Sequence, residues 1–167
     1  VLVRFLTSQK DIKVLAAIKG GNLRNAIARE AEAVIGIPFS AKDDVVAALN
    51  QFVAMIEGEV GDIEKTFQMT METAETPAEI IEPAVAEKLL QALIACPHGV
   101  IGMSRSMPGI VETSTNMASV KQIEPGVIKV ETSQRSSVES EKNMISDMVA
   151  TVFRLAGAEV TQGAGYP

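Results

Sequence analysis

The chain has very few of the residues that carry redox or metal chemistry. Its 167 residues include one cysteine, Cys96, one histidine, His98, and no tryptophan. A lone cysteine cannot form an intrachain disulfide, so a reducing compartment, the cytoplasm, is the expected location. One histidine cannot supply the converging ligands of a metal site, and no nucleophile-elbow motif accompanies it. The sequence therefore predicts no metal and no catalytic residue in this chain, which we expect to be inactive on its own.

Clustered positive charge and long apolar runs are also missing. The 15 lysines and arginines form no run and the net charge is -6, which argues against a nucleic-acid partner. No apolar stretch approaches the roughly 20 residues of a membrane-spanning helix, so no membrane partner is expected. The 47% hydrophobic and 22% charged content is typical of a globular protein. The length allows one well-buried domain or two small halves that share a sheet.

Apolar periodicity and turn residues predict the elements of the chain. We expect capping boxes at Ser40 with Asp43 and at Ser136 with Glu139. The pattern predicts, in order, a helical fragment at 1–6, strands at 11–19 and 25–35 around Gly20-Gly21, a helix at 40–57, a strand at 66–73, a helix from Pro83 to Pro97, a loop or irregular strand at 99–109, strands at 110–122 and 127–135 around Glu124-Pro125-Gly126, a helix ending at Gly157, and a short strand at 159–161.

These elements follow the order helix-strand-strand-helix-strand twice. The two halves, at about 1–76 and 77–167, share little sequence identity, so the repeat concerns element order only. The prediction is an α+β fold of duplicated ferredoxin-like halves, with an antiparallel sheet and helices on one face.

Three polar residues occupy positions where the pattern favours apolar or turn-forming residues: Asn25, Asn116 and Arg135. Arg135 is either a solvated strand end or a carboxylate-binding arginine. Asn25 is either a turn residue or a ligand contact. His98 is expected to end a helix or lie in a loop, and Cys96 is expected to be a small buried apolar residue.

Four motifs carry a resemblance to a known family. They are Leu2-Val3-Arg4-Phe5-Leu6, Gly20-Gly21-Asn22-Leu23-Arg24-Asn25-Ala26-Ile27, Val111-Glu112-Thr113-Ser114-Thr115-Asn116 and Leu155-Ala156-Gly157-Ala158. Through them, and through the terminal Gly163-Ala164-Gly165-Tyr166-Pro167, the chain resembles the aminoacyl-histidine dipeptidases, which are bacterial zinc metallopeptidases.

The resemblance implies that this chain is the lid and dimerisation domain of a larger enzyme, whose catalytic domain binds two zinc ions. The start at Val1, in a helical pattern and without a methionine, suggests an excised segment, and Tyr166-Pro167 would mark re-entry into the catalytic domain. The implied partners are that catalytic domain, a dipeptide such as Xaa-His, and a second copy in a homodimer.

By the same resemblance, Asn25 and Arg135 match the asparagine and arginine that hold the carboxylate of the substrate, and Asn116 joins them as a candidate. Ala28 stands where many relatives have proline. The lid histidine of related peptidases belongs upstream of Val1, so His98 is not assigned that role.

Two other functions remain open from the residues alone. The chain could be a non-catalytic ligand-binding or oligomerisation module of ferredoxin-like type. It could also be a purely structural dimerisation unit, in which Asn25 and Arg135 are idle.

Overall fold

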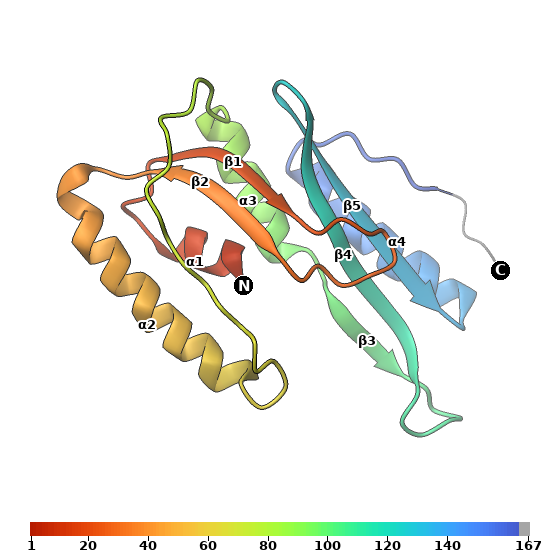
Figure 1. Ribbon diagram of the computed structural model, residues 1–167. Helices are drawn as coiled ribbons and strands as arrows, with labels where there is room; N and C mark the ends of the chain where they lie inside the picture. Colours follow the sequence, from red (N-terminus) through yellow and green to blue (C-terminus); the bar gives the residue numbers. More distant parts are fainter. Residues whose placement is uncertain (164–167) are drawn as a thin grey trace.

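The computed structural model describes residues 1–163 and has an α+β fold with an antiparallel sheet, as predicted (Figure 1). No helix in this described part is long and apolar enough to cross a membrane. The elements are α1 (Leu2–Ser8), β1 (Val14–Gly20), β2 (Ala31–Gly36), the short 3-10 helix η1 (Phe39–Ala41), α2 (Lys42–Val60), α3 (Pro83–Ala95), β3 (Gly99–Met103), β4 (Val111–Glu124), β5 (Val127–Ser136) and α4 (Glu139–Leu155).

The long strand β4 organises the sheet. One edge of β4 pairs with β5, and the other edge pairs with β3 near its start and with β1 near its end. β1 in turn pairs with β2, and every pairing is antiparallel. The contact between β1 and β4 consists of one register pair, Gly20 opposite Val120. Two hairpins, β1–β2 and β4–β5, are therefore joined along a very short seam.

The two hairpins differ in their connections. β4 and β5 meet at the predicted turn, where Gly126 has a φ of 75° that favours glycine. The predicted strand at 25–35 is wrong at its start, because β2 begins only at Ala31. Residues 21–30 instead form a loop, which crosses in front of β4 in Figure 1. The reason is tertiary: Ala26 is hydrogen-bonded to β4 and does not pair with β1.

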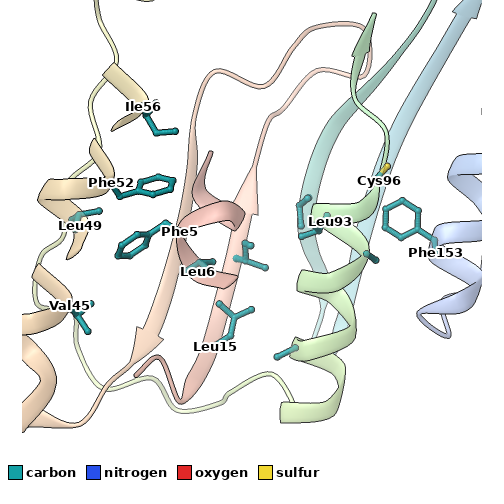
Figure 2. Close-up of a cluster of buried hydrophobic side chains, with 14 of the residues drawn as sticks. Phe5, Leu6, Leu15, Val45, Leu49, Phe52, Ile56, Leu93, Cys96 and Phe153 are labelled. Atoms are coloured by element: carbon teal, nitrogen blue, oxygen red, sulfur yellow. The ribbon is translucent and has the colours of Figure 1, made fainter. Parts of the chain in front are cut away.

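One hydrophobic core joins all four helices to the sheet (Figure 2). Phe5 of α1 lies at its centre with 1% exposure, and its ring centroid is 5.4 Å from that of Phe52 on α2. Aromatic rings at this separation pack favourably in tilted geometry. Because every helix contributes to this core, the helices lie on one face of the sheet, as predicted. The other buried members of the cluster are Leu6, Leu15, Ile18, Ala41, Val45, Leu49, Ile56, Ala86, Ala92, Leu93, Cys96, Val120, Val149 and Phe153.

Two predicted strands are absent and one predicted irregular segment is a strand. Residues 66–73 do not pair with a neighbouring strand. Phe67 and Met69 are partly buried against the core, so the alternation of apolar and polar residues there reflects the burial of one side of the segment. Residues 159–161 are likewise not a strand, whereas β3 occupies the start of the segment at 99–109. The first part of the chain runs α1-β1-β2-α2, and the second runs α3-β3-β4-β5-α4, with β3 as an additional strand between α3 and β4. The division into halves at about residue 76 stays a prediction.

Pro83 begins α3 as predicted, and α2 and α4 begin close to Ser40 and Ser136, but neither predicted capping box forms. The Glu82 carboxylate accepts hydrogen bonds from the amides of Ala84 and Val85 and so caps α3. Neither α2 nor α4 has a side-chain cap. The Ser136 hydroxyl accepts instead from the Val138 amide, ahead of α4, and contacts Thr113 on β4.

Candidate functional site

Asn116 and Arg135 lie on the same face of the β4–β5 hairpin. Ser114 is opposite Arg135 and Asn116 is opposite Ser133 in the antiparallel register. Residues that lie opposite each other project to the same face of the sheet, and so does every second residue along a strand. Asn116 and Arg135 are therefore diagonal neighbours on one face. Such diagonal pairs in antiparallel sheets are roughly 7–8 Å apart, within reach of a long side chain.

The opposite face of the hairpin is covered by α4. Thr113 and Thr115 are buried there with 1% and 3% exposure. The Thr113 hydroxyl donates to the Glu141 carboxylate of α4, and Gln134 Nε2 donates to Thr115 Oγ1 at 3.1 Å. Because α4 takes this face, Asn116 and Arg135 are left on the uncovered face of the hairpin.

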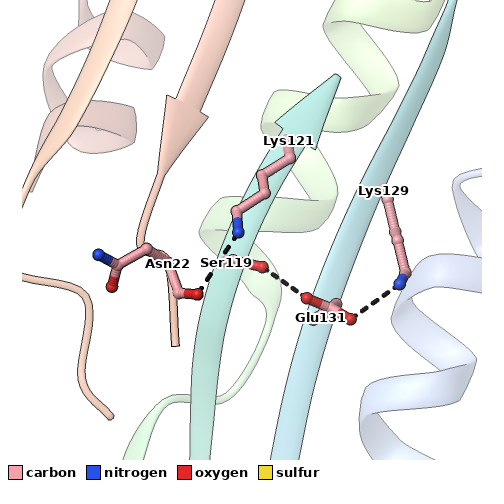
Figure 3. Close-up of polar contacts among 5 residues, drawn as sticks. All are labelled: Asn22, Ser119, Lys121, Lys129 and Glu131. Atoms are coloured by element: carbon pink, nitrogen blue, oxygen red, sulfur yellow. Dashed lines mark hydrogen bonds and ion pairs between the residues drawn. The ribbon is translucent and has the colours of Figure 1, made fainter. Parts of the chain in front are cut away.

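The loop at 21–30 lies over this uncovered face. Asn116 Nδ2 donates to the backbone oxygen of Ala26 at 2.8 Å, across 90 positions of sequence. Lys121 Nζ contacts the backbone oxygen of Asn22 at 3.5 Å (Figure 3). Asn25, next to Ala26, is an exposed turn residue. The fold therefore brings all three predicted residues to one region, although they come from separate segments.

Arg135 is exposed and forms no ion pair with any of residues 1–163. The cation on the same strand and face, Lys129, is instead bound by Glu131 at 2.8 Å (Figure 3). Hydrogen bonds from Lys129 and from the Ser119 hydroxyl lower the pKa of the Glu131 carboxyl. Arg135, unlike Lys129, therefore has no carboxylate partner among residues 1–163.

Asn116 has one satisfied and one unsatisfied polar atom. Its Oδ1 is buried and has no hydrogen-bond partner among the described residues. Leaving a buried acceptor unpaired costs about 1–3 kcal/mol. The hydrogen bond from Nδ2 nevertheless fixes the orientation of the Asn116 side-chain amide. Rotating the amide by half a turn would place Oδ1, an acceptor, against the backbone oxygen of Ala26, which is also an acceptor.

His98 follows α3, as predicted, and lies beside the same part of β4. Its Nδ1 accepts the backbone N–H of Met117 at 3.1 Å. An imidazole nitrogen that accepts a hydrogen bond carries no proton, so Nδ1 is the acceptor of this contact and Nε2 remains as the ring donor. No residue type or spacing indicates this contact, since it joins residues from two separate elements.

Two hollows on the described surface do not contain the predicted residues. One hollow of about 580 Å³ lies between β1–β2 and the end of β4, and Gly20, Gly21, Glu30 and Lys121 are part of its lining. Asn25, Asn116 and Arg135 are not part of this lining. Asn25 and Arg135 lie exposed on an open part of the surface, and Asn116 is half-buried beside them.

The residues present do not fit a metal centre. Within residues 1–163, no three side chains of His, Cys, Asp or Glu are grouped closely enough to hold an ion.

The fold and the sequence together match a known class of domain. Residues 14–64, which include β1, β2 and α2, match the family described as the peptidase dimerisation domain. The architecture of α+β type, with its antiparallel sheet, is that of such a dimerisation domain.

Two individual proteins resemble the chain over almost all of its length. It is 30% identical over 169 residues to the cytosol non-specific dipeptidase of Escherichia coli strain K12, a match to 100% of this chain and 35% of that protein. It has a TM-score of 0.90 and 32% identity to the structure of aminoacylhistidine dipeptidase from Vibrio alginolyticus, covering 95% of this chain and 32% of that one. The predicted relationship to these dipeptidases is confirmed, and the chain spans about a third of their length.

Proposed function

We propose that this chain is the lid and dimerisation domain of a metal-dependent dipeptidase that cleaves short peptides such as Xaa-His. The observation that carries the proposal is the structural likeness to aminoacylhistidine dipeptidase over 95% of the chain. The full protein would be a cytoplasmic peptide hydrolase, and its catalytic domain, outside this chain, would bind two zinc ions.

In this proposal the lid closes over the active site, and Asn25 and Arg135 hold the terminal carboxylate of the substrate. The free guanidinium of Arg135 supports this role, because arginine binds a carboxylate through two parallel hydrogen bonds. A dipeptidase must position the scissile bond at a fixed distance from that carboxylate, and such a contact provides the required orientation. The open shape of the surface is also what a lid needs, since the opposing wall would come from the catalytic domain.

The test uses the full-length protein and two matched substrates. One is an Xaa-His dipeptide, and the other is the same dipeptide with its terminal carboxylate converted to an amide. We expect Arg135→Ala to lower kcat/KM for the free dipeptide about 10- to 100-fold, as for the loss of a charge-assisted pair. The amide should already be a poor substrate and should lose little more, because it has no carboxylate for Arg135 to bind.

Lys129→Ala is the matched control, because it removes a cation from the same strand and face but leaves Arg135 in place. It should leave kcat/KM unchanged for both substrates. Equal losses for the dipeptide and its amide in Arg135→Ala, or no loss for either, would contradict the carboxylate role.

A further inference from the structure

One edge of β4 has a gap in its strand pairing. β3 pairs with β4 as far as Thr115, and β1 pairs with it at Val120. Between these positions, residues 116–119 have no strand partner on that edge within the described part of the chain. A bulge in the β4–β5 register falls between Met117 and Ser119, which further disturbs the regular pleat here.

Groups from elsewhere in the chain occupy this gap. His98 accepts the N–H of Met117, and the 21–30 loop approaches Ala118 with its first residue and Asn116 with its middle. A Cβ added to Gly21 would lie 2.0 Å from the backbone oxygen of Ala118, so the start of the loop is packed directly on the β4 backbone. This close approach and the Lys121 contact to Asn22 fix only the first two residues of the loop.

The middle of the loop depends on Asn116. Within residues 1–163, its hydrogen bond to Ala26 is the one that ties this neighbour of Asn25 to β4, because the Ala26 N–H bonds inside the loop, to the oxygen of Leu23. The amide already donates to this protein carbonyl, and its oxygen is buried without a hydrogen-bond partner among residues 1–163. A side chain arranged in this way is suited to holding the loop, and its acceptor is not presented to a substrate.

We propose that Asn116 is a positioning residue, whose hydrogen bond to Ala26 clamps the 21–30 loop onto β4 and so fixes Asn25 over the face that carries Arg135. This role rests on the proposed function, in which Asn25 and Arg135 bind the substrate carboxylate. The clamp sets the separation of these two groups before the substrate arrives.

The first experiment tests the clamp in the full-length protein without substrate. Asn116→Asp keeps the shape of the side chain but replaces the donor with a carboxylate oxygen that repels the Ala26 carbonyl. Arg24 provides a tryptic site inside the loop, and cleavage by trypsin requires local opening of the chain. We expect cleavage after Arg24, followed by mass spectrometry, to become about tenfold faster, the change expected for loss of about one hydrogen bond.

Ser119→Ala is the matched control. It removes a side-chain hydrogen bond from the same strand, 3.0 Å to Glu131 on β5, and leaves the loop contacts intact. Cleavage after Arg24 should stay within twofold of the native rate. An unchanged rate in Asn116→Asp, or an equal increase in both variants, would overturn the clamp. If Asn116→Asp does not fold, Asn116→Ala is measured in its place against the same criteria.

The second experiment measures coupling to Asn25 through kcat/KM for the free dipeptide. We expect Asn25→Ala to cost about tenfold in the native background and less than about twofold in the Asn116→Asp background. If Asn116 had only a structural role, the effects of Asn25→Ala and Asn116→Asp on kcat/KM would multiply in the double variant. If Asn25→Ala has no effect in either background, the carboxylate proposal fails while the proteolysis result still decides the clamp.

Discussion

At the scale of single residues, burial controls the chemistry of Cys96. The side chain is 7% exposed, and its thiol is directed at the backbone oxygen of Pro97 at 3.6 Å. Burial raises the pKa of this thiol from 9.0 to about 11. The prediction from sequence of a small buried apolar residue is therefore confirmed, and the thiolate required for nucleophilic attack is disfavoured.

We predict that Cys96 does not react with a thiol-specific reagent at pH 8 while the protein is folded, and reacts fully in urea.

The stability of the fold should also depend on the pKa of the Cys96 thiol. Because the folded pKa is raised, the stabilisation is present below about pH 9 and is lost as the pH rises through 11. The free energy of unfolding should thus fall by about 1–2 kcal/mol more between pH 9 and 11 in the native chain than in Cys96→Ala. Parallel pH profiles for the two would contradict this assignment.

At the scale of elements, the β1–β2 loop and the β4–β5 turn make different demands on their glycines. Gly21 and Gly126 both have positive φ, 66° and 75°. A Cβ at Gly126 meets nothing within 4 Å, whereas a Cβ at Gly21 collides with the Ala118 carbonyl. We predict that Gly126→Ala costs about 1–2 kcal/mol from conformation alone, and that Gly21→Ala costs clearly more, measured by urea unfolding. Equal costs would show that the loop does not rest on β4.

Local chemistry explains which elements could be predicted from the sequence. Pro125-Gly126 and Pro83 impose their conformation on a few neighbouring residues, and both predictions are correct. The alternation at 66–73 is real, but alternation records which side chains are buried and does not reveal whether a neighbouring strand exists. The start of β2 was misplaced because Ala26 is held by a residue 90 positions away.

The candidate site shows the same limit. Asn25 and Arg135 stand out in the sequence as polar residues at positions where the pattern favours apolar or turn-forming ones, and the register of a single hairpin places Arg135 beside Asn116. The contacts of Asn116 and His98 each join segments that only the assembled sheet brings together. Their partners are backbone atoms, N–H and C=O groups present at nearly every position, so no residue type in the sequence indicates them.

At the scale of the whole molecule, the open surface and the absence of a metal-holding cluster in residues 1–163 give a prediction about activity. The 167-residue chain alone, supplied with zinc, should not cleave an Xaa-His dipeptide, and the full-length protein should cleave it in a chelator-sensitive manner. Sedimentation of that protein should give the mass of a dimer, as the match to a peptidase dimerisation domain suggests. Cleavage by the isolated chain would contradict the lid proposal, and a monomeric full-length protein would contradict the dimerisation role.

The single register pair between Gly20 and Val120 has a consequence for how the chain acquires its structure. The β4–β5 hairpin spans 26 residues from Val111 to Ser136 and can form early, because closing a short loop costs little entropy. Pairing of β4 with β1 requires contacts between segments about 100 residues apart and adds only one register pair to the sheet. We therefore expect the two hairpins to fold as separate units and the seam between them to close last, when α3 and the 21–30 loop dock.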